Sequence, residues 1–261
     1  MAETEVIVGR SPGQIAWRRF KRNKVGVVSA ILSITFVLAS LFAPIICKIV
    51  GVDPNTMHQD ALDLTSGIPK LPHYGIGLSH PLGLLPGTGR DLFAQLLYGS
   101  RISFSIAFIT SITYVGIGLT LGISAAYIGG VFDNFIGRIA DFLLSFPTTF
   151  MFVALSVPLT MRVESLGLAK DNGARIIVMV LVLTIFSWPS FFRVVRSQVL
   201  SLREREFVLA AQALGASKFR IIFNELLPNL WPLAIIYLSI SLPRCISTFL
   251  ISPWVGLNTS L

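Results

Sequence analysis

Charged side chains are scarce in this chain. Asp, Glu, Lys and Arg make up 13% of its 261 residues, whereas soluble domains carry about a quarter. Hydrophobic residues make up 53%, and the mean hydropathy is +0.75. This composition excludes an ordinary soluble domain and predicts a membrane protein.

Cysteine is also scarce, and two kinds of motif are missing. Cys47 and Cys245 are the two cysteines, each in or beside an apolar run, so they form neither a disulfide framework nor a metal-ligand spacing. We expect both to be small buried side chains. No GxxxxGK[ST] phosphate loop is present, so the chain is not expected to bind ATP. It also contains no internal repeat and no low-complexity linker.

What is present is a series of apolar runs, each long enough to cross a bilayer, which takes roughly 20 helical residues. They predict an all-α membrane protein, a polytopic bundle of about five transmembrane helices. The expected spans are about 25–47, 102–128, 142–161, 176–195 and 229–250. We expect residues 1–24 to form an N-terminal segment, 25–250 a transmembrane domain and 251–261 a divergent tail. Small residues in the second run predict close helix packing.

The distribution of basic residues predicts the orientation. Residues Trp17–Lys24 include five Lys and Arg, which places the N-terminus in the cytoplasm by the positive-inside rule. The segments then expected inside carry thirteen Lys and Arg, and those expected outside carry seven. The net charge of +8 therefore reflects the basic residues that set the topology, and these residues can also contact anionic lipid. We expect no nucleic-acid partner.

Residues 196–228 differ from the apolar runs, because their pattern predicts a cytoplasmic helix, turn and helix. Apolar residues recur at helical spacing on two successive stretches. The first stretch has Phe207, Ala210, Ala211 and Leu214, and the second has Phe219, Ile222, Phe223 and Leu226. Between them, Gly215 is suited to end one helix and Ser217 to cap the next. The alternative is a helix lying on the lipid headgroups.

The order of residues in this loop resembles a known family. Ala210-Ala211, then Gly215, then Leu226-Leu227-Pro228 is similar to the EAA loop of ATP-binding-cassette importer permeases, although Leu209 stands where the loop's glutamate is expected. Four further blocks resemble the second (C-type) permease subunit of dipeptide, oligopeptide and nickel importers, in the family's order across about residues 17–243. These blocks are FKRNKVGVVSA, HPLG…GRDLFAQLLYGSRISF, YIGGVFDNFIGRIADFLLSFPT and SWPSFFRVVRSQVLSLREREFV.

The resemblance implies a permease subunit of an ATP-driven importer, for dipeptides or oligopeptides, in the bacterial inner membrane. It implies a second homologous permease that shares the translocation pathway, two ATP-binding subunits and an extracytoplasmic substrate-binding protein. The chain itself is then expected to be no enzyme and to bind no cofactor or metal, with ATP and Mg held by the partner subunits. Coupling to those subunits is expected through residues 203–228.

The resemblance also implies which residues dock. The expected contacts with the ATP-binding subunit are Leu209, Ala210, Ala211, Gly215, Ala216 and Ser217. Phe207, Leu214 and Phe219 are expected to pack the docking helices. We expect Gly215 to matter most, because a side chain there would obstruct the tight turn.

Two alternatives stay open. The first is a nickel-importing permease, because His58, His73 and His80 share the expected outward loop with Asp60 and Asp63. The separations of these histidines, however, match no compact metal-ligand pattern such as HExxH.

The second alternative comes from the end of the sequence. After Pro243 the expected glutamate helix and sixth span are not recognised, and Arg244 falls inside the fifth apolar run, where a charge is costly. A truncated or frameshifted, non-functional permease fragment is therefore the other alternative.

Overall fold

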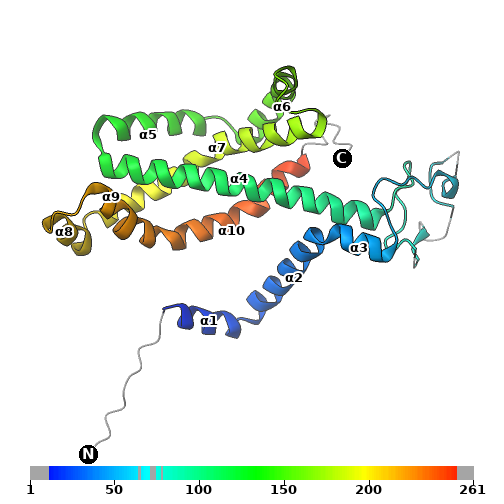
Figure 1. Ribbon diagram of the computed structural model, residues 1–261, viewed down its shortest axis with the longest axis horizontal. Helices are drawn as coiled ribbons and strands as arrows, with labels where there is room; N and C mark the ends of the chain where they lie inside the picture. The colour runs from blue at the N-terminus through cyan, green and yellow to red at the C-terminus, as the bar shows by residue number, and fades with distance from the viewer. Residues whose placement is uncertain (1–11, 64–65, 71–74, 78, 252–261) are drawn as a thin grey trace, which may run out of the picture. The chain divides into compact units, whose positions relative to one another are not determined.

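The computed structural model describes residues 12–63, 66–70, 75–77 and 79–251. The chain divides into two units, Met1–Arg101 and Ile102–Leu261. In the described part of the chain every regular element is a helix, and strand-type pairing is limited to three isolated bridges between residues 57 and 91. The predicted all-α class is confirmed (Figure 1).

Unit 1 contains the N-terminal helices and the loop that follows them. Its elements are α1 (Pro12–Arg22), α2 (Lys24–Leu41), α3 (Ala43–Val50), η1 (Gln59–Ala61) and the first ten residues of α4 (Leu92–Ile128). The Asn23 side chain caps α2 by accepting a hydrogen bond from the Gly26 amide at 3.0 Å. Ser40 Oγ lies 2.7 Å from Ser100 Oγ, which ties α2 to the start of α4.

The first predicted span, 25–47, is not one helix. It is divided at Phe42, where α2 ends and α3 begins. Pro44 lies in the first turn of α3, a position where its missing N–H leaves no helical hydrogen bond unmade. Beyond this break, Cys47 is buried against Ala94 and Leu97, as expected of a small apolar side chain.

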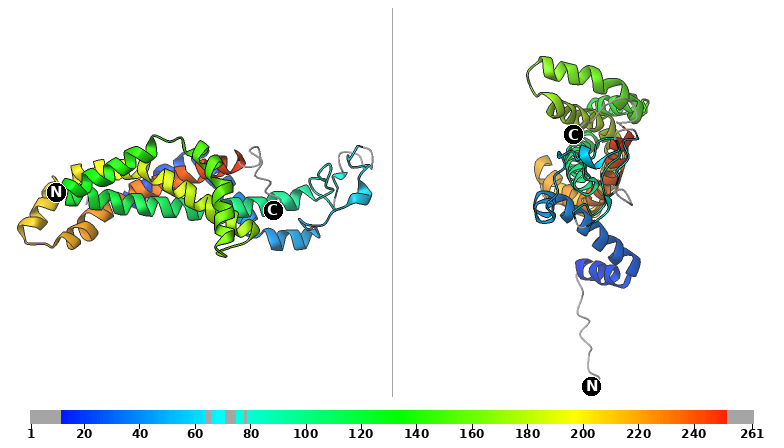
Figure 2. Two further views of the ribbon diagram at one scale, coloured as in Figure 1. Left: turned by 90° about the horizontal axis from the view of Figure 1, so that it is seen from above. Right: turned by 90° about the vertical axis from the view of Figure 1, so that its right-hand side faces the viewer.

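Unit 2 contains the rest of α4 and all later helices. These are α5 (Gly130–Leu144), α6 (Thr148–Ser165), α7 (Asp171–Leu202), α8 (Glu206–Ala213), α9 (Lys218–Arg220), the π-helix η3 (Ile221–Leu226) and α10 (Leu227–Ile251). Helices α4, α7 and α10 run side by side, and α5 lies along α7 (Figure 1, Figure 2). One buried cluster joins α4, α7, α8, η3 and α10.

The contact between α4 and α7 depends on two glycines. A Cβ placed on Gly122 would lie 2.7 Å from Val195 Cγ1, and one on Gly118 would lie 3.0 Å from Phe191 Cδ1. Such distances leave no room for a side chain, so the two backbones approach as small residues allow in membrane helices. The close packing predicted for the second apolar run is confirmed at these two positions.

The predicted span 142–161 coincides with no single helix. It begins in the last turn of α5, passes through the break at 145–147 and ends within α6. The two helices meet at 84°. Pro147 accounts for the break, because the residue before a proline is driven out of helical geometry. Four other helical stretches of the described residues are long and apolar enough to cross a membrane, and the bent pair brings the number to as many as five.

Gly122→Ala is expected to destabilise unit 2 by about 1–3 kcal/mol, because the added methyl group overlaps Val195. The measurement is the midpoint of thermal denaturation of the purified protein in detergent. Gly116→Ala is the matched control, since a Cβ on Gly116 of the same helix meets nothing within 4 Å. Equal midpoints for the two variants would contradict the close contact of α4 with α7.

Candidate functional site: a coupling turn and a polar pocket

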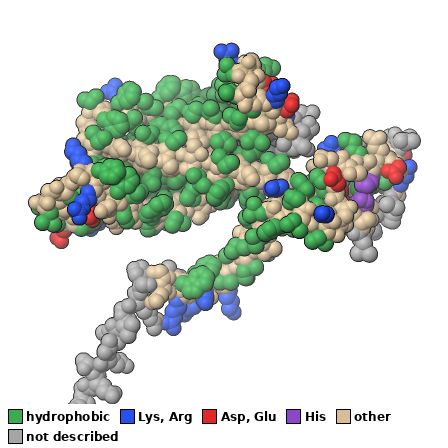
Figure 3. Space-filling view, viewed as in Figure 1, with side chains coloured by type: hydrophobic (Ala, Val, Ile, Leu, Met, Phe, Trp, Pro, Cys, Tyr) green, Lys and Arg blue, Asp and Glu red, His purple; other side chains and the backbone are tan. Residues whose placement is uncertain are grey.

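The coupling segment, residues 203–228, connects the end of α7 to the start of α10. Helix α8 is followed by a turn over residues 214–217, then by α9 and η3. The Arg203 guanidinium donates to the carbonyl of Ala126 at 3.2 Å, which holds the end of α4 beside the end of α7. Lys, Arg, Asp and Glu side chains gather at this end of unit 2 (Figure 3). The predicted helix, turn and helix is confirmed.

The turn is made by Gly215 and Ser217. Gly215 has a φ of +77°, and its amide donates to the Gln212 carbonyl at 2.9 Å. Ser217 Oγ caps α9 by accepting from the Arg220 amide at 3.3 Å. The expectation that a side chain at Gly215 would obstruct the turn is wrong, because a Cβ there meets nothing within 4 Å. The left-handed backbone is what requires glycine.

The six predicted docking residues gather around this turn with unequal exposure. Those exposed are Leu209, Ala210, Gly215 and Ser217, and those half-buried are Ala211 and Ala216. The two half-buried alanines pack against the main core of unit 2. Four of the six residues are therefore accessible to a partner.

The three residues expected to pack the docking helices are all exposed, although Phe219 packs on Phe223 at the surface. Phe207, Leu214 and Phe219 expose 39%, 88% and 71% of their surface. Val208 is fully buried instead. The predicted apolar face is wrong on α8 because the helix ends at Ala213, so Leu214 cannot continue it.

On the second stretch the predicted face is confirmed in part, because Leu226 and Ile222 pack in the main core while Phe219 and Phe223 are exposed. The difference follows from the helix type. Residues 221–226 form a π-helix, whose wider turn places residues five apart on one face. Ile221 and Leu226 are accordingly buried, while Phe219 and Phe223 pack on each other at the surface with ring centroids 4.3 Å apart. Five large apolar side chains of the segment are thus exposed, here together named the tip surface: Phe207, Leu209, Leu214, Phe219 and Phe223.

Two ion pairs join α5 to α7 next to the coupling segment. The Arg196 guanidinium donates two hydrogen bonds to the Asp133 carboxylate, at 2.5 and 2.6 Å. One turn away, Arg193 pairs with Asp141. The first pair is the more shielded, because the Asp133 side chain is 12% exposed and that of Asp141 is 63% exposed. Sequence reasoning missed both pairs, since nothing local to either helix identifies its partner.

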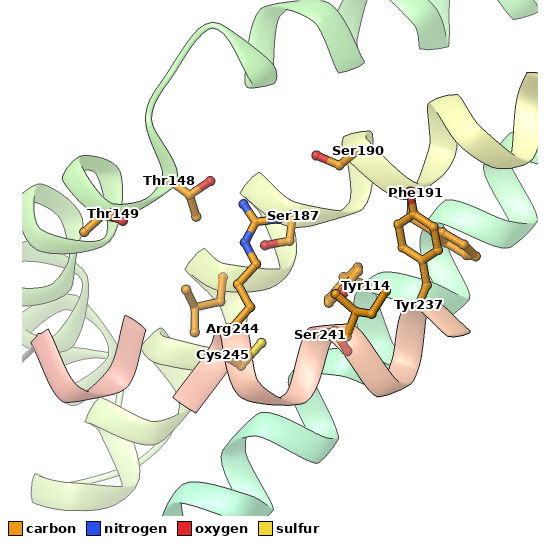
Figure 4. A pocket seen from close by; sticks show the side chains of 12 residues that line it. Tyr114, Thr148, Thr149, Ser187, Ser190, Phe191, Tyr237, Ser241, Arg244 and Cys245 are labelled. Atoms are coloured by element: carbon orange, nitrogen blue, oxygen red, sulfur yellow. The ribbon is translucent and has the colours of Figure 1, made fainter. Parts of the chain in front are cut away.

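A polar pocket of about 90 Å³ lies between the helices of unit 2. Figure 4 shows the Arg244 guanidinium extending from α10 toward Ser187 of α7 and Thr148 of α6. The polar side chains that line the pocket are Tyr114, Thr148, Thr149, Ser187, Ser190, Tyr237, Ser241 and Arg244. Sequence reasoning noted Arg244 and missed the others, although serines and threonines inside apolar runs were the available signal.

His58 and His80, from the loop expected to face outward, lie in unit 1. His80 Nδ1 lies 2.8 Å from one oxygen of Asp91, whose other oxygen accepts from the Ala94 amide and caps α4. The ring of His58 packs edge-on against that of His80 at 4.9 Å. Among the described residues no three His, Cys, Asp or Glu side chains form a group that could hold a metal. His73 lies outside the described residues.

Comparison with known proteins identifies the family. Residues 118–261 match the model of the binding-protein-dependent transport system inner membrane component. The chain belongs to this family. Residues 11–65 match the N-terminal transmembrane domain of oligopeptide transport permease C. The first match includes the whole coupling segment and continues past Pro243, where we expected the resemblance to end.

Three of the proteins similar to this chain are described here, and all are permeases. A dipeptide transport permease of Alkalihalophilus pseudofirmus is 32% identical over 219 residues, which are 84% of this chain and 63% of that protein. An oligopeptide transport permease of Haemophilus influenzae is 31% identical over 96% of this chain and 73% of its own length. A glutathione transport permease of Pectobacterium atrosepticum is 28% identical over 95% and 74%. The chain thus spans about two thirds to three quarters of the length of these proteins.

Reversing the charge at either end of the shielded ion pair is expected to loosen α5 from α7. Asp133→Arg or Arg196→Asp should lower the free energy of unfolding by about 1.5–3 kcal/mol, the usual value of a hydrogen bond to a charged group. The double variant should recover most of the loss. Reversals at Asp141 and Arg193, both more than half exposed, are the control and should cost less than about 1 kcal/mol. A double variant no more stable than its parents in thermal denaturation would contradict the pairing.

Gly215→Ala is expected to cost about 1–2 kcal/mol of local stability, because an L-residue is strained at the left-handed φ of this turn. Gly215→Asn should cost less, since asparagine tolerates that conformation. Hydrogen exchange of the amides of α8 and η3 measures the effect. Equal exchange in the alanine and asparagine variants would contradict the assignment of strain to the turn.

Proposed function

We propose that this chain is one of two homologous permease subunits of an ATP-driven importer of dipeptides or oligopeptides in the bacterial cell membrane. It forms the translocation pathway with a second permease and receives an extracytoplasmic binding protein. Two ATP-binding subunits, which hold ATP and Mg, engage the coupling segment. The observation that carries the proposal is the exposed turn at Gly215, with its tip surface, in the chain segment that matches a transport-component family.

The chemistry of the tip surface supports docking of a protein. Five large apolar side chains are exposed there. Phe207, Leu209 and Leu214 lie between the charged stretches Arg203–Glu206 and Lys218–Arg220, Phe219 lies within the second stretch, and Phe223 follows it. An apolar area rimmed by polar residues is typical of a protein contact site. A lipid-facing surface would not be interrupted by charges of both signs, which are costly in hydrocarbon.

The helices on either side of the coupling segment connect it to the pocket, so ATP binding to a partner can change the pocket. Helix α7 enters the segment and α10 leaves it, with unbroken helix from Lys218 to Ile251. Both helices also line the polar pocket. A partner that binds the coupling segment differently in its ATP-bound and ATP-free states would shift α7 against α10 and so change the pocket.

The distribution of charge supports an orientation with the N-terminus and the coupling segment in the cytoplasm. Arg18, Arg19, Lys21 and Arg22 of α1 are exposed and lie before the first apolar helix. The basic residues of the coupling segment would lie on the same side, as the positive-inside rule requires.

The names of the relatives favour peptides as the substrate class. Dipeptide, oligopeptide and glutathione permeases are all among the similar proteins, and each of these substrates is a peptide. Nickel is the competing substrate, and uptake measurements with a labelled dipeptide and with radioactive nickel separate the two. Uptake of nickel alone would overturn the peptide assignment.

Leu214→Glu tests the docking role, because Leu214 is the most exposed residue of the tip surface. A charge placed in a desolvated contact is expected to lower recovery of the ATP-binding subunits by about tenfold or more when the tagged chain is purified in mild detergent. ATP-driven uptake of a labelled dipeptide by the reconstituted complex should fall in parallel.

Leu168→Glu is the matched control. Leu168 is 69% exposed in the turn between α6 and α7, at the other end of α7 from the coupling segment. This variant should retain its ATP-binding subunits and its uptake. Full recovery of those subunits with Leu214→Glu would show that they dock elsewhere.

A further inference from the structure

A positive charge lies within the apolar part of α10. Helix α10 begins at Leu227, and Arg244 lies seventeen residues further along it. At 1.5 Å per residue, the two are about 26 Å apart along the helix axis. The hydrocarbon core of a bilayer is about 30 Å thick. Tyr114, which lines the same pocket, is near the middle of the apolar stretch of α4 that begins at residue 102. At about 26 Å of about 30 Å, Arg244 lies toward the end of the apolar span opposite Leu227. An ionisable residue within such a span marks a ligand pathway or a charged partner.

The surroundings of Arg244 are polar on every helix that lines the pocket. Tyr114 comes from α4, Thr148 from α6 and Ser187 from α7, while Ser241 precedes Arg244 on α10. Hydroxyl groups and a guanidinium together supply hydrogen-bond donors to one small volume. None of the described residues that line the pocket is acidic. Such a donor-rich site fits an anion, and a planar carboxylate matches the fork of a guanidinium.

The size of the pocket restricts what it can hold. The volume of the pocket is about 90 Å³. Sites for whole small molecules measure about 300–1,000 Å³. The pocket therefore accommodates one functional group of a larger ligand, such as a terminal carboxylate, and leaves the rest of that ligand outside.

The position of the pocket connects it to the coupling segment. Phe191 of α7 packs against Tyr237 of α10 with ring centroids 4.6 Å apart, and both rings line the pocket. Any change in the angle between α7 and α10 moves Ser187 relative to Arg244. A ligand group held by both residues would be bound in one arrangement and released in the other.

From these observations we propose that the pocket around Arg244 is a binding site for the carboxylate of the transported ligand, with Arg244 as the charged contact and the hydroxyls of Ser187 and Thr148 as further donors. This proposal rests on the proposed import function and extends it by naming the group of the substrate that the permease itself recognises. The C-terminal carboxylate of a peptide and an acidic side chain share this chemistry.

The test compares labelled Ala-Phe, which has a free C-terminal carboxylate, with Ala-Phe amide, which has none, and with Ala-Glu amide, which has one on its side chain. Uptake by the complete reconstituted complex is measured for the wild type and for Arg244→Gln. The ratio of wild-type to variant uptake is taken for each peptide separately, so that any preference of the binding protein cancels.

We expect Arg244→Gln to lower uptake of Ala-Phe by about 10- to 100-fold, the range that corresponds to losing a hydrogen bond to a charged group. Uptake of Ala-Phe amide should change less than about threefold. A large effect on Ala-Glu amide would assign the site to side-chain carboxylates, and a small one would assign it to the C-terminus. Arg244→Lys, which keeps the charge, should recover part of the Ala-Phe uptake.

Arg162→Gln is the matched control, because Arg162 is exposed on α6 and does not line the pocket. Equal losses for Ala-Phe and Ala-Phe amide in Arg244→Gln would overturn the proposal. So would loss of the second permease from the purified Arg244→Gln complex, because Arg244 would then hold a subunit interface. A wild-type complex that imports none of the peptides would instead refute the proposed function.

Discussion

The close contact of α4 with α7 at Gly118 and Gly122 is the constraint on which unit 2 depends. Without side chains at these two positions, the backbone of α4 reaches Val195 and Phe191 directly. In lipid, where burial of apolar surface gives little advantage, such packing supplies the association between helices. The contact fixes α7, and α7 in turn holds α5 through Arg196 and Arg193 and leads into the coupling segment.

The coupling segment is anchored in the bundle by some of its residues and exposed at others. Val208, Ile221 and Leu226 are buried in the main core, so α8 and η3 move with the bundle. The side chains of the tip surface are exposed, so a partner can bind them. The family gives the general role of the chain, while the exposure of Leu214 and the left-handed conformation of Gly215 describe a short turn that is open to contact.

Much of this arrangement could be predicted from the sequence, because its causes are local. Long apolar runs require helices, and Gly215 followed by Ser217 requires a turn and a cap. The π-helix at residues 221–226 could not be predicted, since Phe219, Ile222, Phe223 and Leu226 follow an α-helical spacing equally well. The partnership of Asp133 with Arg196 and the grouping of Tyr114 with Arg244 depend on residues more than 60 positions apart. Only folding brings them together.

The contact of Phe191 with Tyr237 lies at unequal distances along α10 from Leu227 and from Arg244. From Leu227 to Tyr237 is ten residues of helix, or about 15 Å, and from Tyr237 to Arg244 is seven, or about 10 Å. If α10 pivots as a rigid rod at this fulcrum, the guanidinium moves about two thirds as far as the coupling end and in the opposite direction. A displacement of the coupling segment would thus be accompanied by a smaller, reversed displacement at the pocket.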